Sequence, residues 1–129
     1  MENFIAKGDE RFINFPDVIF DAATGACSIQ GKSSMEDAVG FYEPAIAWIE
    51  RYCKEIKKPL HLSFNLNYYN TSSSKVFQSI LSLLKEYQVQ GGEVSIKWYY
   101  PKEDESIAEE AEDMMRFIGL NIEIIPLGD

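Results

Sequence analysis

The sequence is poor in the residues on which most catalytic and metal sites depend. It contains a single histidine, His61, and two cysteines, Cys27 and Cys53, neither of which has a second cysteine two or three residues away. This spacing fits neither a zinc site nor a thioredoxin-like motif, so we interpret both cysteines as buried free thiols in a reducing cytosol. The GxxxxGK[ST], HExxH, CxxC and EF-hand patterns are also missing. We therefore predict no metal site and no cofactor.

Basic residues are scarce as well. The chain has 12 lysines and arginines against 21 acidic residues, a net charge of −9. Because binding to nucleic acids and to anionic membranes depends largely on clustered Lys and Arg, this charge disfavours both as partners. No apolar run approaches the roughly 20 residues of a membrane-spanning helix. The first residues, Met1-Glu2-Asn3, do not resemble a signal peptide, and we expect a cytoplasmic protein.

The chain has the size and hydrophobicity of one globular domain. It contains 129 residues, of which 46% are hydrophobic, enough to bury a core but too few for two domains. We expect a single domain over residues 1–129. Apolar periodicity and turn residues predict the following elements in chain order: an edge strand or arm within 3–16, a hairpin of 18–20 and 26–31, a helix from 38 to about 56, a strand at 60–67, a helix ending before 91, a strand at 93–100, a helix ending at 119 and a strand at 121–125.

The first predicted helix raises two questions. Residues 33–37 (SSMED) offer capping hydroxyls followed by carboxylates, which is typical of a helix start. Pro44 interrupts the pattern that follows, because proline removes a helical hydrogen bond and clashes with the preceding turn. We expect either a kink or a short helical turn ahead of a main helix that has Pro44 in its first turn.

Strands that alternate with helices predict parallel neighbours joined by right-handed crossovers, and the opening hairpin adds an antiparallel pair. The predicted fold class is therefore α/β, with a mixed sheet and helices packed on it. In such sheets, functional groups collect beyond the carboxyl ends of the parallel strands. Residues 70–74 (NTSSS) lie at such an end, between the strand at 60–67 and the next helix.

This hydroxyl-rich turn holds Asn70, Thr71, Ser72, Ser73 and Ser74. A helix start leaves backbone N–H groups unpaired, so at least one of residues 70–74 must cap it, and we expect this cap to be Thr71 or a neighbouring serine. A single helix cap accounts for one of these side chains and leaves the other hydroxyls of the turn unexplained. The surplus at the positive end of a helix suits a phosphate or a phosphorylated side chain. We interpret the turn as a regulatory site, although the pattern does not say which hydroxyl is modified.

Aromatic residues end two strands of the predicted sheet. Strand alternation places about half of them in the core, with Tyr68 and Trp98 expected to point inward. The candidate partner surface beside the hydroxyl turn draws on Tyr68, Tyr69, Tyr99 and Tyr100, since exposed aromatic residues are typical of protein interfaces.

Catalysis is not predicted, because His61 lies within a strand on the face opposite its leucines and has no local partner for nucleophilic chemistry. Two alternatives to a regulatory protein remain. One is a small enzyme or ligand-binding domain that holds an anionic metabolite past the strand ends. The other is a structural subunit of a stable complex.

Four stretches carry a resemblance to a known family: residues 16–31 (PDVIFDAATGACSIQG), the helix at 41–52, residues 64–75 (FNLNYYNTSSSK) and residues 93–100 (EVSIKWYY). Over nearly its whole length the chain resembles the SiaC family of bacterial regulatory phosphoproteins, and the NTSSSK block is the most specific match. Residues 35–38 depart from the Pro-Glu-Asn-like sequence that is frequent in the family.

The resemblance implies a fold similar to that of STAS-type anti-sigma-factor antagonists and a role in partner switching. In the family, a kinase with a histidine-kinase-like ATPase fold phosphorylates the threonine of the NTSS motif, and a PP2C-like phosphatase reverses the reaction. That threonine corresponds to Thr71, with Asn70, Ser72, Ser73 and Ser74 around it. The dephosphorylated family protein binds and activates a diguanylate cyclase, which links the switch to cyclic-di-GMP and biofilm control.

Overall fold

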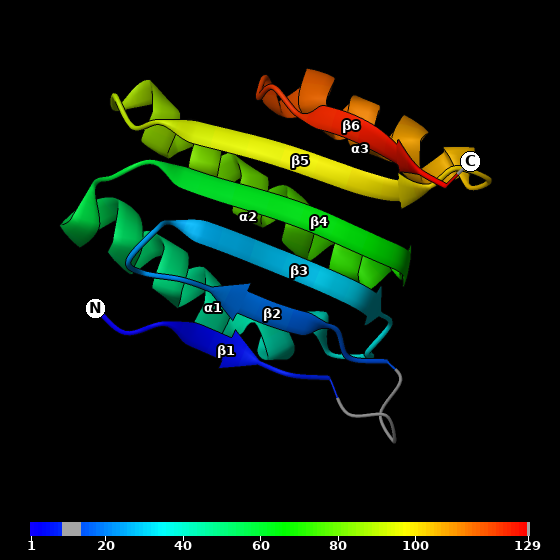
Figure 1. The fold of residues 1–129 in the computed structure, drawn as a ribbon, viewed down its shortest axis with the longest axis horizontal. Coiled ribbons are helices and arrows are strands. Elements are labelled where there is room, and N and C mark those ends of the chain that lie inside the picture. The colour runs from blue at the N-terminus through cyan, green and yellow to red at the C-terminus, as the bar shows by residue number, and fades with distance from the viewer. Residues whose placement is uncertain (9–13, 129) are drawn as a thin grey trace.

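The computed structural model describes residues 1–8 and 14–128, and within these ranges six strands form one mixed sheet in the order of the chain (Figure 1). Residues 9–13 of the predicted N-terminal edge strand or arm lie outside the described residues. The first two pairings are antiparallel and the remaining three are parallel. The strands are β1 (Phe4–Ala6), β2 (Asp17–Phe20), β3 (Ala26–Ser33), β4 (Leu60–Tyr69), β5 (Val94–Pro101) and β6 (Glu123–Leu127).

The predicted edge strand and hairpin are confirmed. The hairpin of β2 and β3 turns at Gly25, whose φ of +76° lies in the left-handed region that glycine tolerates. The carbonyl oxygen of Gly25 also accepts a hydrogen bond from the amide of His61 in β4, at 2.8 Å. The last strand differs slightly from the prediction, since β6 includes Pro126. Proline is tolerated there because β6 is an edge strand.

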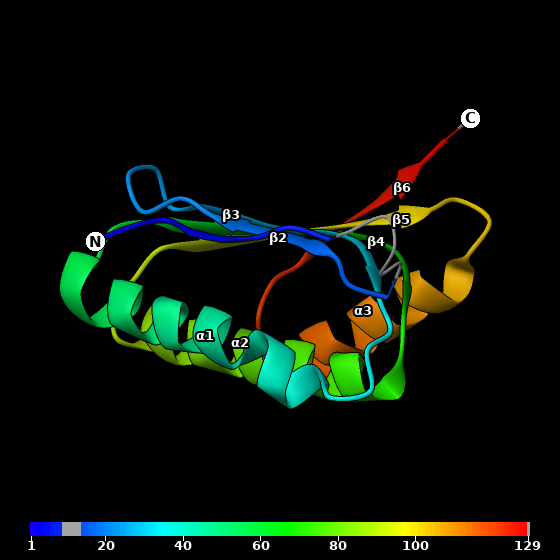
Figure 2. The ribbon, with the colours of Figure 1, turned by 90° about the horizontal axis from the view of Figure 1, so that it is seen from below.

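In the described part of the chain, three α-helices cover one face of the sheet: α1 (Ala38–Arg51), α2 (Thr71–Val89) and α3 (Glu105–Ile118) (Figure 2). Each parallel connection leads to the neighbouring strand, so right-handed crossovers place every helix on the same side. Among the described residues, no helix covers the opposite face, which is called the open face below (Figure 2). The predicted single-domain α/β fold with a mixed sheet is thus confirmed. None of these helices combines the length and the apolar character needed to span a bilayer.

The core lies between the sheet and the helices, as the sequence periodicity predicts. Every second residue of β4 from Leu60 to Leu66 is buried beneath the helices. Trp98 of β5 stacks on Phe64 with ring centroids 4.1 Å apart, and Phe77 of α2 meets Phe64 edge-on at 5.1 Å. These aromatic contacts fasten α2 to the two central strands and so fix the position of its first turn.

The start of α1 differs from the prediction. Ser33 is the last residue of β3 and is fully buried, while the cap is Asp37, whose side chain accepts from the amide of Gly40 at 2.9 Å. One helix runs through Pro44, so the expectation of a separate turn ahead of it is wrong. Pro44 is exposed, and water can therefore satisfy the carbonyl that its missing N–H leaves without a helical partner. A π-helical turn, η1 (Tyr52–Ile56), extends α1 to the predicted end at Ile56.

Candidate functional site at the start of α2

The hydroxyl-rich turn lies at the predicted edge of the sheet, where the parallel strands β3, β4 and β5 end. Helix α2 begins immediately after β4. The amide of Asn70 donates to the carbonyl oxygen of Ser33 at 3.0 Å, which ties the end of β4 to the end of β3. The first turn of α2 is thus held by the backbone of the sheet itself.

The N-cap of α2 is Asn70, so the expectation that Thr71 or a serine caps the helix is wrong. The Oδ1 atom of Asn70 accepts from the amide of Ser73 at 2.9 Å. Its Nδ2 atom donates to the carbonyl oxygen of Met35, also at 2.9 Å. An amide side chain carries both an acceptor and a donor, so Asn70 accepts from the helix and donates to the preceding loop at the same time. This arrangement leaves Thr71 without a capping role.

Ser73 belongs to a buried polar network. Its side chain is 0% exposed, and its Oγ atom lies 2.7 Å from Oγ of Ser33 and donates to the carbonyl oxygen of Ser33 at 3.0 Å. The Ser33 hydroxyl lies 2.7 Å from the Tyr42 hydroxyl. Burial raises the pKa of Tyr42, so its phenol stays protonated and can donate. Ser73 therefore joins β3, α1 and α2, and no enzyme can reach it in the folded chain.

Ser74 is also buried and has a different partner. Its hydroxyl donates to Oε1 of Glu110 on α3. Ser72 is half-buried, and Thr71, the first residue of α2, is exposed. Among the four hydroxyl residues of the turn, Thr71 is thus the one that a modifying enzyme can approach most freely.

A small cavity of about 120 Å³ lies beside Thr71, lined also by Tyr69, Asn70, Ser74 and Glu110. Sites for metabolites usually measure about 300–1,000 Å³, so this one is too small for most of them. The Glu110 carboxylate would also repel an anion. Burial, followed by the charge of Glu110, raises the pKa of the Tyr69 phenol. The cavity therefore does not favour the alternative of an anionic metabolite past the strand ends.

Glu110 is a site residue that the sequence did not reveal. In the sequence it belongs to an acidic run on α3, for which a solvated face is the ordinary interpretation. The structure brings it from α3 to the first turn of α2, 36 positions away along the chain from Ser74. Only the packing of α3 against α2 makes this contact, and no local pattern signals it.

The four candidate tyrosines do not form one patch. The register of β3 and β4 shifts between Gly31 and Lys32, so that Lys32 pairs with Tyr68 and Asn67 is passed over. This bulge breaks the alternation of β4. Tyr68 is consequently 51% exposed rather than inward, and Lys32 Nζ lies 5.6 Å from its ring centroid.

The remaining tyrosines divide between the two faces of the sheet. Tyr69 turns toward the helices and packs against Phe77, with ring centroids 5.6 Å apart. Tyr100 likewise packs against the core, whereas Trp98 is fully buried as predicted. Tyr99 lines a hollow on the open face of the sheet. The exposed aromatic residues next to the turn are thus reduced to Tyr68, with Tyr99 on the same face.

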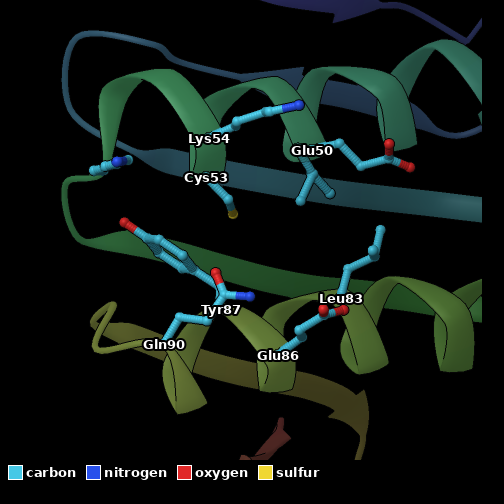
Figure 3. Close-up of a pocket in the computed structure, with 9 residues that line it drawn as sticks. Glu50, Cys53, Lys54, Leu83, Glu86, Tyr87 and Gln90 are labelled. Atoms are coloured by element: carbon cyan, nitrogen blue, oxygen red, sulfur yellow. The ribbon is translucent and has the colours of Figure 1, made fainter.

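A larger groove of about 390 Å³ opens at the far end of α2, between that helix and η1. In Figure 3, Cys53 and Tyr87 face each other across it. The prediction that both cysteines are buried is confirmed for Cys27 and wrong for Cys53, which is only partly buried. Burial raises the pKa of Cys53 to about 11 and that of Cys27 to about 12. Neither thiol is ionised at neutral pH, so neither is an activated nucleophile.

The sole histidine has an ordinary polar partner. His61 is exposed on the open face of the sheet, as predicted, and its Nδ1 atom lies 2.6 Å from Oγ of Ser95. Within residues 1–8 and 14–128, no three His, Cys, Asp or Glu side chains gather as they would around a metal ion.

Comparison with known proteins identifies the family. The model of the SiaC family, described as "SiaC family regulatory phosphoprotein", matches residues 9–127. This chain belongs to the SiaC family. The predicted resemblance is therefore confirmed, and the exposed threonine at the start of α2 lies in a regulatory phosphoprotein.

Solved SiaC structures share the fold. SiaC of Pseudomonas aeruginosa superimposes with a TM-score of 0.89 at 31% identity, over 98% of this chain and 100% of that one. SiaC in a crystal structure with the diguanylate cyclase SiaD, whose activator it is, gives 0.88 at 31% identity, over 96% and 99%. An uncharacterized protein of P. aeruginosa strain UCBPP-PA14 is 38% identical over 98 residues, 76% of this chain and 78% of that protein.

Proposed function

We propose that this SiaC-family chain is a non-enzymatic partner-switching regulator, controlled by reversible phosphorylation of Thr71. The observation that carries the proposal is that the residues of the turn have different structural roles. Asn70 caps the helix, Ser73 and Ser74 are buried in hydrogen bonds, and Thr71 is exposed. A phosphate on Thr71 would break none of these contacts.

The first turn of α2 also suits the charge of a phosphate. Phosphorylation adds about −1.5 to −2 charges, which the N-terminal end of a helix stabilises through its dipole and its unpaired amides. Glu110 lines the inner side of the cavity beside Thr71 and would direct the phosphate outward by repulsion. The new charge would therefore lie on the exposed surface at the start of α2, where it alters docking and leaves the fold intact.

The proposed partners follow from the family. A kinase with a histidine-kinase-like ATPase fold would add the phosphate and a PP2C-like phosphatase would remove it. The proposed effector is a diguanylate cyclase, bound and activated by the dephosphorylated form. Support for this effector comes from P. aeruginosa SiaC, which has been crystallised with the diguanylate cyclase SiaD as its activator. We place the switch in the cytoplasm, where such enzymes have access to ATP.

Incubation with the cognate kinase and ATP is expected to add one phosphate to the wild-type chain, on Thr71. Intact-mass measurement and site mapping by tandem mass spectrometry would show this directly. The Thr71→Ala variant should remain unmodified, because Ser73 and Ser74 are buried and Ser72 is half-buried. Phosphate found on Ser72 or elsewhere, with Thr71 untouched, would refute the assignment.

A further inference from the structure

Helix α3 presents a large apolar side chain to solvent. Phe117 is 89% exposed, although α3 buries its other apolar face against the sheet. Phe117 borders a groove of about 420 Å³ between α3 and α2, which the buried Met114 and the half-buried Ile118 also line. An exposed aromatic residue beside an apolar hollow is typical of a protein interaction surface. The residues that line this groove are Gln78, Glu110, Asp113, Met114, Phe117 and Ile118.

The two charged residues that line this groove, Glu110 and Asp113, are both acidic. Helix α3 carries five carboxylates and a single basic residue, Arg116. Arg116 forms an ion pair with Asp113 at 2.9 Å on the surface. Glu110 also borders the groove, and it accepts a hydrogen bond from the hydroxyl of Ser74. A partner that buried this apolar surface would therefore meet an excess of negative charge.

We propose that the α2–α3 groove is the docking site for a cationic amphipathic helix of a partner protein. Its apolar face would lie on Phe117, Met114 and Ile118, and its Lys or Arg residues would face Glu110 and Asp113. Such helices bind apolar grooves through side chains spaced three and four residues apart. A second copy of this chain fits poorly, because a symmetric contact would bring two acidic rims together.

The groove adjoins the proposed phosphorylation site. We expect a negative charge on Thr71 to affect binding at the groove differently from binding of the effector. Glu110 lines both the groove and the cavity beside Thr71. A negative charge on Thr71 would add to the attraction for a cationic helix, whereas it is expected to weaken effector binding. The groove thus suits a partner that stays bound in both states of Thr71, such as an enzyme that acts on it. The docking itself does not depend on the proposed function.

The test uses a synthetic 18-residue amphipathic peptide with leucine and phenylalanine on one face and lysine on the other, followed by fluorescence anisotropy. Phe117→Ser is expected to weaken binding at least about tenfold, although the net charge is unchanged. Val89→Ser is the matched control, since Val89 is 73% exposed at the end of α2 outside the groove. Its affinity should stay within about twofold of wild type. Circular dichroism would verify that both variants fold.

Three further measurements distinguish the proposed cationic helix from other occupants of the groove. The double variant Glu110→Gln, Asp113→Asn should bind the cationic peptide more weakly, and its affinity should depend less on salt concentration. A peptide with glutamate in place of lysine should not bind the wild-type chain. Thr71→Glu should bind the cationic peptide at least as tightly as wild type, even if the phosphorylation proposal fails. Equal affinity of Phe117→Ser and wild type would overturn the proposal, as would equal binding of the acidic peptide. A dimer in light scattering that Phe117→Ser dissociates would assign the groove to a second copy instead.

Discussion

Ser73→Asp is expected to leave the chain largely unfolded at 37 °C, whereas Thr71→Asp should keep a thermal midpoint close to that of wild type. Ser73 is 0% exposed, and its hydroxyl donates to the carbonyl oxygen of Ser33. A carboxylate cannot donate, so it would face that carbonyl as a buried, unpaired charge. The cost is several kcal/mol, a large share of the roughly 5–15 kcal/mol that stabilise a domain. Thermal denaturation followed by circular dichroism measures the difference.

Ser73→Ala is the control for the loss of the hydroxyl alone. It removes the bonds to Ser33 without adding charge, and we expect a cost of about 1–3 kcal/mol with the fold retained. Thr71→Asp places its carboxylate at the exposed first position of α2, where the helix dipole contributes about 0.3–1 kcal/mol of stabilisation. Similar midpoints for Ser73→Asp and Thr71→Asp would show that the buried network does not distinguish the two hydroxyls.

Thr71→Glu is expected to weaken binding to the cognate diguanylate cyclase at least about tenfold, while Thr71→Ala stays within about threefold of wild type. The reason is that the added carboxylate lies on the exposed first residue of α2, beside the cavity that Glu110 lines, where a docked effector would have to desolvate it. Isothermal titration calorimetry with the purified cyclase gives the affinities.

Gln88→Glu provides a matched control for that experiment. It adds the same charge to an exposed position of α2, about 25 Å from Thr71 at 1.5 Å per residue. We expect it to bind the cyclase as wild type does. Equal affinities for Thr71→Glu and Thr71→Ala would argue against a switch operated by charge.

Periodicity predicts most of this fold because burial repeats along each element. The apolar residues of β4 and α2 mark the faces that meet in the core, and Gly25 and Gly119 take the left-handed conformations that end a turn and a helix. The bulge at Lys32 and Tyr68 is not predictable in this way, since it depends on the pairing of two strands that are distant in the sequence. One passed-over residue was enough to exchange the faces of Tyr68 and Tyr69.

The location of the site follows from the sequence, but its internal arrangement does not. Residues 70–74 identify a helix start at the carboxyl edge of a sheet. The pattern treats Asn70, Thr71 and Ser73 as equivalent caps, because each can accept from a helix amide. Tertiary contacts with Met35 and Ser33 separate them. The family resemblance implies that Thr71 is the phosphorylated residue. The structure adds that Thr71 is exposed, so a kinase could approach it.

The most direct measurement compares activation of the cognate diguanylate cyclase by two homogeneous preparations of this chain, one unphosphorylated and one carrying phosphate on Thr71. We predict that cyclic-di-GMP synthesis rises with the unphosphorylated chain, stays at its basal rate with the phosphorylated chain, and is restored when a PP2C-like phosphatase removes the phosphate. Equal activation by both preparations, or activation by the phosphorylated chain alone, would contradict the proposed switch.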